Sequence, residues 1–144
     1  MLIYIGGSAL AIGAGIALGW IWAYYPCHLL LPAGFALLPG FGISLLGDSR
    51  PTRELVLPTL ISTLLMTLMI HAEMYWAFQG PVDGFWDFLE TRLERGEIVI
   101  PTKHGSINAS GGWLLFVWIL DVAIIAAVIW LMAKRRHKPG QIIR

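Results

Sequence analysis

The sequence predicts an all-α, polytopic membrane protein: a four-helix transmembrane bundle with a short amphipathic helix on its outer surface. The first observation is composition, because 57% of the 144 residues are hydrophobic and only 13% are charged, whereas about a quarter of a soluble domain is charged. The others are four long apolar segments and an uneven distribution of Lys and Arg between their linkers. A net charge of +1 argues against nucleic acid as a partner, since nucleic-acid binding needs a clustered basic face.

The four apolar segments lie at residues 2–24, 28–46, 55–78 and 113–133, in a single membrane domain that covers residues 1–144. Each approaches the roughly 20 apolar residues that a spanning helix needs. The first segment has no basic region and no small-residue cleavage site, so we expect a retained helix rather than a signal peptide. The first two linkers are short, which makes consecutive helices antiparallel neighbours.

The orientation of the bundle follows from the basic residues. Arg50, Arg53 and the cluster Lys134–Lys138 lie on one side of the predicted membrane, whereas Asp and Glu outnumber Lys and Arg in the loop at residues 79–112. Cytoplasmic loops carry the excess of Lys and Arg. We therefore expect both termini in the cytoplasm, the long loop outside, and a bacterial inner membrane as the location.

The second apolar segment leaves an alternative topology open. It contains Pro32, Pro39 and three glycines, and proline removes a backbone donor and kinks a helix. A break at residues 39–42 would produce a re-entrant hairpin, which survives at membrane depth only inside protein or beside water. That alternative leaves three spanning helices and moves the N-terminus to the other side.

The loop at residues 79–112 contains a predicted helix over Asp83–Arg95. Its apolar residues recur near helical spacing, opposite Asp87, Glu90 and Glu94, so it would lie on the membrane surface with its aromatic face down. Residues 97–101 are predicted to be extended and residues 106–112 to be rich in turns. Residues 108–110 match a glycosylation sequon, but this tripeptide is common and is weak evidence for glycosylation. The apolar face consists of Phe85, Trp86, Leu89 and Leu93, and the candidate outer interface consists of Trp76, Phe85, Trp86, Leu89 and Trp113.

Small residues form a ridge along the first helix, at Gly7, Ala11, Gly15 and Gly19. Residues four apart share a helix face, and small-xxx-small faces let helix backbones approach closely in lipid. The ridge could receive a partner subunit or another helix of the same chain. We favour the second interpretation, because a four-helix protein needs such faces for its own packing.

The third helix carries a polar stripe made of Thr59, Thr63, Thr67, His71 and Tyr75, which recur at every fourth residue. One interpretation is the lining of a hydrophilic path. The other, which we favour, is that the hydroxyl groups bond back to carbonyls of their own helix or to a neighbouring helix.

Ionisable groups inside the membrane are expensive, so each is a functional candidate. They are His28, His71, Glu73 and Asp121, which all fall in the outer half of the predicted bundle. His71 and Asp121 come to similar depth, so we predict that these two side chains pair across antiparallel helices. A relay of protons or ions through the cluster is one alternative, and a structural hydrogen-bond cluster is the favoured one.

The sequence does not contain a pattern that predicts a cofactor. Cys27 and the cluster could ligate a metal, but no His-x₃-His or Glu-x-x-His pair is present. His28 and His71 could ligate a haem, yet their predicted depths differ by about two helical turns. We expect His104 and His137 to be solvated.

No catalytic motif is present, so the sequence argues against an enzyme. It favours a small accessory or structural subunit of a larger integral-membrane complex, in contact with lipids and with other membrane subunits or further copies of itself. The alternative is a small oligomeric transporter or an ion or proton conduit that uses the polar stripe. A weaker alternative is a haem- or metal-binding redox protein.

Overall fold

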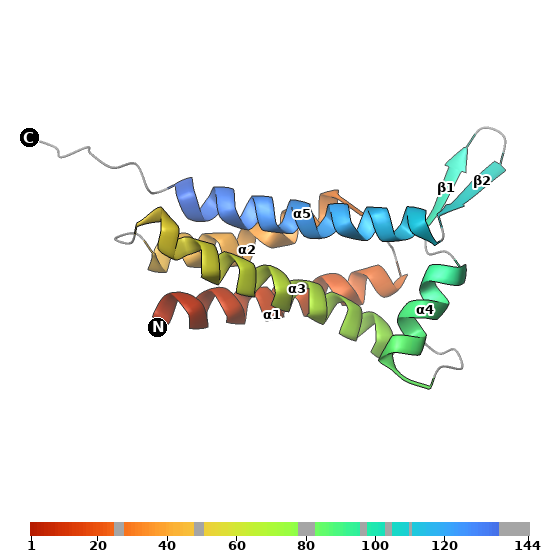
Figure 1. Cartoon of the computed structure of the whole chain (residues 1–144), viewed down its shortest axis with the longest axis horizontal. Coiled ribbons are helices and arrows are strands. Elements are labelled where there is room, and N and C mark those ends of the chain that lie inside the picture. Colours follow the sequence, from red (N-terminus) through yellow and green to blue (C-terminus); the bar gives the residue numbers. More distant parts are fainter. Residues whose placement is uncertain are drawn as a thin grey trace, which may run out of the picture.

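The structure is a computed structural model of the whole chain and describes residues 1–24, 28–47, 51–77, 83–95, 98–102, 105–109 and 111–135. The long helices lie side by side, and a short helix with a β-hairpin lies at one end (Figure 1). The start of the first helix and the end of the last lie at the opposite end. The elements are α1 (Leu2–Tyr24), α2 (Leu30–Leu46), the short 3-10 helix η1 (Thr52–Leu55), α3 (Val56–Ala77), α4 (Phe85–Arg95), β1 (Ile98–Thr102), β2 (Gly105–Ala109) and α5 (Gly112–Arg135).

Three helices of the described chain are long and apolar enough to cross a membrane: α1, α3 together with η1, and α5. Their bounds fall within a few residues of the predicted segments, because the length of an apolar run is a local property of the sequence. α2 is shorter, with 17 residues, or about 25 Å at 1.5 Å per residue against a hydrocarbon core of about 30 Å. The chain is therefore a helical protein with three helices able to span a membrane.

α2 is a continuous helix, so it lacks the break at residues 39–42 on which the alternative topology depends. Pro39 lies inside the helix, which membrane helices tolerate because neighbouring groups compensate for the lost backbone bond. After α2 the chain is back at the end where it started, since Gly47 packs against Ile3 of α1 and Leu55 of η1. The segment does not form a re-entrant hairpin.

The small-residue ridge of α1 packs against other helices of this chain. A Cβ atom added at Gly15 would lie 2.6 Å from the carbonyl oxygen of Met66, and one at Gly19 would lie 2.6 Å from that of Ile70. Gly7 faces both α2 and α3, and Ala11 is fully buried. The ridge is therefore an internal packing surface, as we favoured, and is not available to a partner subunit.

Glycine has the same role between α2 and α5. A Cβ atom at Gly40 would lie 2.7 Å from Cβ of Met132 and 3.1 Å from Cα of Ile129. Close backbone approach thus joins both helix pairs, α1 with α3 and α2 with α5. Apolar side chains of all four long helices fill the space between them, among them Leu18, Ile43, Met66, Ile70, Ile125 and Ile129.

The loop between α4 and α5 contains a two-stranded antiparallel sheet, so the all-α prediction is incomplete. β1 and β2 pair from Ile98 with Ala109 to Thr102 with Gly105. The extended conformation predicted at residues 97–101 is confirmed over residues 98–101. The turn predicted at residues 106–112 is wrong over residues 106–109, because this segment pairs with β1 and satisfies its backbone as a strand.

Candidate polar site inside the bundle

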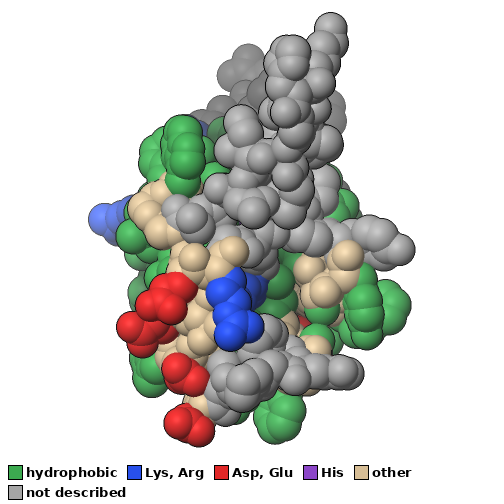
Figure 2. Space-filling view, turned by 90° about the vertical axis from the view of Figure 1, so that its right-hand side faces the viewer, with side chains coloured by type: hydrophobic (Ala, Val, Ile, Leu, Met, Phe, Trp, Pro, Cys, Tyr) green, Lys and Arg blue, Asp and Glu red, His purple; other side chains and the backbone are tan. Residues whose placement is uncertain are grey.

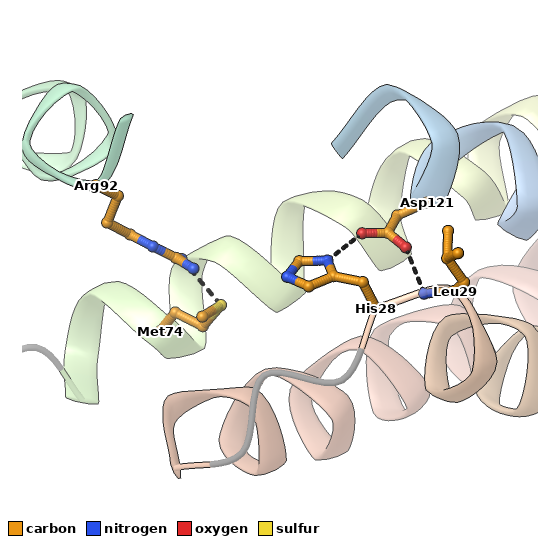
Figure 3. A network of polar contacts seen from close by, with 5 residues as sticks. All are labelled: His28, Leu29, Met74, Arg92 and Asp121. Carbon is orange, nitrogen blue, oxygen red and sulfur yellow. Dashed lines mark hydrogen bonds and ion pairs between the residues drawn. The ribbon is translucent and has the colours of Figure 1, made fainter. Parts of the chain in front are cut away.

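The carboxylate of Asp121 in α5 binds the beginning of α2. Nδ1 of His28 lies 2.5 Å from Oδ2, and the backbone N–H of Leu29 donates to Oδ1 over 2.8 Å (Figure 3). The side chains of His28 and Asp121 are only 7% and 5% exposed. Each oxygen of this buried carboxylate therefore already accepts a hydrogen bond from the chain itself.

The backbone at Leu29, which donates a hydrogen bond to Asp121, is strained. The N–H of Leu30 donates to the carbonyl of His28 over 2.8 Å, which closes a three-residue γ-turn with Leu29 at its centre. Leu29 has φ 68° and ψ −60°, a conformation that residues other than glycine rarely adopt and that costs free energy. Asp121 accepts two hydrogen bonds, one from each of the first two residues of the turn, and these offset this cost.

The predicted pair of His71 with Asp121 is wrong, because the Asp121 carboxylate hydrogen-bonds to His28 instead. α2 begins at Leu30 rather than at His28, and the turn before it lies between the helices. His28 consequently packs against Trp22, with ring centroids 4.4 Å apart, and reaches the level of Asp121. The predicted depth difference of two turns between His28 and His71 assumed that α2 begins at the surface.

His71 lies beside this pair, on a small pocket that it shares with Asp121. Its ring packs edge-on against Trp118, with centroids 4.9 Å apart. Within the described part of the chain, its buried Nδ1 atom has no hydrogen-bond partner. The pocket has room for about one water-sized group and is lined by Trp22, Thr67, Ile70, His71, Trp118, Asp121, Val122 and Ile125.

The polar stripe of α3 divides into three parts. Thr59 and Thr63 are buried between helices, and the Thr63 hydroxyl donates to the Thr59 carbonyl over 2.9 Å, as the favoured interpretation predicts for such groups. Thr67 and His71 line the pocket. Tyr75 is at the α4 end, where it packs against Phe88 with ring centroids 5.5 Å apart.

Glu73 belongs to another side of α3. A Cβ atom added at Gly19 of α1 would lie 2.7 Å from Cβ of Glu73, so this residue borders α1. It is absent from the lining of the pocket that holds His71 and Asp121. The structure thus brings together three of the four predicted ionisable residues, and Glu73 is the one that it leaves out.

A buried arginine on α4 is the principal residue that the sequence analysis missed. Arg92 is 8% exposed, donates from Nη1 to the Met74 sulfur over 3.0 Å (Figure 3), and lies over the rings of Phe88 and Trp118 at 5.3 and 5.5 Å. Cation–π contacts of this kind offset part of the cost of burial. Burial lowers the pKa of the Arg92 guanidinium to about 9, because desolvation disfavours the charged form.

The face that α4 turns toward the bundle contains Phe88 and Arg92, neither of which belongs to the apolar face predicted to lie on the membrane. Phe88 and Arg92 are its buried residues, whereas Trp86 is 79% exposed. The spacing of Phe85, Phe88 and Arg92 on one helix face could have indicated this arrangement. From the sequence, Arg92 entered only as one of the basic residues of the loop at residues 79–112, in the argument for the orientation of the bundle.

The predicted outer interface is at the α4 end and contains two kinds of residue. Phe85 and Leu89 are half-buried and pack against the core. Trp76, Trp86 and Trp113 are exposed over 79%, 79% and 65% of their surface. Figure 2 looks onto this end and shows acidic side chains gathered at one side, with hydrophobic ones around the periphery; the exposed acidic residues of α4 and its lead-in are Asp83, Asp87, Glu90 and Glu94.

Metal-ligating side chains do not gather into a site in the part of the chain that the structure describes. No group of three His, Cys, Asp or Glu side chains among them could hold a metal ion. The pocket beside His71 accommodates about one water-sized group, far less than a porphyrin. Several predicted features lie outside the described residues: Cys27, Arg50, His104, Ser110 of the sequon, and the basic tail from Arg136 to Lys138.

Comparison of the chain with protein-family models, with curated proteins and with solved structures finds no match. Its function is therefore argued from the geometry of the polar site and of the α4 end.

Proposed function

We propose that this protein is a small structural subunit of a larger integral-membrane complex. The observation that supports the proposal is that both carboxylate oxygens of Asp121 accept hydrogen bonds, one from the His28 ring and one from the Leu29 backbone. A catalyst or carrier needs its intramembrane charge to face a substrate. Here the carboxylate instead fixes the position of α2 against α5, which is the task of a structural residue.

In this proposal four segments cross the membrane, with α2 as the short fourth one. The beginning of α1 and the end of α5 share one end of the molecule, and Lys134 lies at that end of α5. The positive-inside rule then places this end in the cytoplasm, in a bacterial inner membrane. α4 and the hairpin would lie at the outer surface.

The α4 end is the surface through which the subunit would contact its partners. Three tryptophans are exposed there, and tryptophan is enriched both in protein interfaces and in the interfacial belts of membrane proteins. Lipids would cover the exposed apolar sides of the long helices. A partner subunit would cover Trp86, which projects from α4 away from the bundle.

Purification in a gentle detergent followed by native mass analysis tests this proposal. We expect a foreign membrane chain to co-purify in fixed stoichiometry, and Trp86→Ala to remove it without lowering the thermal stability of this protein. The matched control is Trp20→Ala, because Trp20 is 62% exposed but lies on α1. A monodisperse assembly of this chain alone would contradict the proposal.

A second candidate function is a small proton or ion conduit, favoured by one specific observation. Nδ1 of His71 and the hydroxyl of Thr67 are buried without a partner in the described chain, and both residues line the pocket beside Asp121. If the candidate is right, His71→Ala and Asp121→Asn reduce flux in proteoliposomes, whereas Thr63→Val does not. Unchanged flux in the first two variants rejects it.

A further inference from the structure

The pocket between α1, α3 and α5 contains polar atoms that the protein itself does not satisfy. Thr67 and His71 contribute from α3, and Asp121 contributes from α5. The Oγ1 atom of Thr67 and Nδ1 of His71 are buried and have no hydrogen-bond partner among the described residues. Buried polar groups in native proteins are nearly always hydrogen-bonded, so two such atoms on residues that line the same pocket indicate a bound molecule.

The chemistry of the lining restricts what that molecule is. A hydroxyl both donates and accepts, an imidazole nitrogen does one or the other, and a carboxylate only accepts. Water is the smallest molecule that can serve all three. The pocket has room for about one molecule of this size, which is the space that a buried water needs.

The surroundings disfavour a cation at the same place. Both Asp121 oxygens already accept hydrogen bonds from His28 and Leu29. The Arg92 guanidinium lies 5.5 Å from the ring of Trp118, which is itself a wall of the pocket. Among the described residues, no three metal-ligating side chains come together.

We infer that this pocket binds one water molecule, which hydrogen-bonds the Thr67 hydroxyl and Nδ1 of His71 and extends the network to the carboxylate of Asp121. The bound water joins α3 to α5. It also continues the hydrogen bonds of the His28–Asp121 pair across the bundle to His71. The inference depends on neither proposed function, because a structural subunit and a conduit would hold this water alike.

Solution NMR of the full chain in lipid nanodiscs tests the site directly. We expect magnetisation transfer from water to the methyl groups of Val122 and Ile125, which line the pocket. Ile129 is the control, because it is fully buried in the same helix but does not line the pocket. Absence of transfer to Val122 and Ile125, or equal transfer to Ile129, would overturn the inference.

A pair of isosteric variants provides a second, independent test. If water bridges Thr67 to His71, Thr67→Val removes one partner of that water and lowers the melting temperature by several degrees. If the hydroxyl is simply unsatisfied, the same change leaves the melting temperature unchanged or raises it, which contradicts the inference. Thr63→Val is the control, since Thr63 bonds only to its own helix in the described chain.

The same thermal assay distinguishes water from a cation. Replacing sodium in the buffer with potassium or ammonium should leave the melting temperature of the wild-type protein unchanged. A rise with either ion that Thr67→Val abolishes would show that the pocket takes a cation, and the assignment to water would then be wrong.

Discussion

His28 and Asp121 are 93 residues apart in the sequence, yet Nδ1 of one lies 2.5 Å from a carboxylate oxygen of the other. This contact links the first turn before α2 to the middle of α5. A carboxylate accepts hydrogen bonds, so the hydrogen of the imidazole is placed on Nδ1. The pair therefore fixes the orientation of the ring as well as the position of the helix that follows.

The γ-turn before α2 predicts an unusual response to glycine. Leu29 has a positive φ and is 41% exposed, so Leu29→Gly relieves strain and removes little buried surface. We expect it to leave stability unchanged or to raise it by up to about 1 kcal/mol. Leu30→Gly, within α2, should instead lower stability by about 1 kcal/mol. Thermal unfolding of both variants checks this, and equal losses would contradict the strained turn.

Two glycines of α1 should respond in opposite ways to one added methyl group. Gly15→Ala places a Cβ atom 2.6 Å from the Met66 carbonyl oxygen, whereas Gly13 has no neighbouring atom within 4 Å of that position. Overpacking should cost Gly15→Ala about 1–3 kcal/mol. Gly13→Ala should be neutral or stabilising, because alanine favours the helix. The comparison is made by thermal unfolding, and equal stability of the two variants would rule out the close packing of α1 on α3.

The buried Arg92 predicts a pH dependence. Burial lowers its pKa to about 9, well below its usual range, so above pH 9 the unfolded chain binds this proton more tightly than the folded one. Stability should therefore rise as the pH increases above about 9, and the whole burial penalty should be present below pH 9. The melting temperature of Arg92→Leu should not rise in this way as the pH increases above 9.

Arg95 provides the control for that measurement, because it lies on the same helix but is exposed. Arg95→Leu should retain the rise in melting temperature above pH 9 that the wild-type protein shows. An identical pH profile for the two leucine variants would mean that the rise in melting temperature above pH 9 is not caused by the burial of Arg92.

The long helices could be predicted from the sequence because each depends on a run of apolar residues. α1 was predicted at residues 2–24 and found at Leu2–Tyr24. The spacing of Gly15 and Gly19 also predicted a close-packing face, although it did not decide whether a partner subunit or this chain's own helices pack on that face. The pairing of β2 with β1 did not, since strand pairing depends on a partner segment and Gly105–Ala109 carries no apolar alternation.

The residues of the candidate site could be predicted from the sequence, but which of them pair with each other could not. His28, His71 and Asp121 were recognised because ionisable groups inside apolar segments stand out. Their pairing depends on where α2 begins, and that depends on a positive φ at Leu29. No glycine or asparagine marks this turn in the sequence, so the choice of His28 over His71 as the partner of Asp121 could not be read from it.

A double-mutant cycle on His28 and Asp121 tests most directly whether the intramembrane polar groups hold this bundle together. The unfolding free energies of the wild type, His28→Leu, Asp121→Asn and the double variant are measured in mixed micelles, with a Thr63→Val and Asp121→Asn cycle as control. We predict a coupling of about 1–2 kcal/mol for the first pair and none for the second. Additive effects of His28→Leu and Asp121→Asn, to within about 0.3–0.5 kcal/mol, would contradict the structural role assigned to this pair.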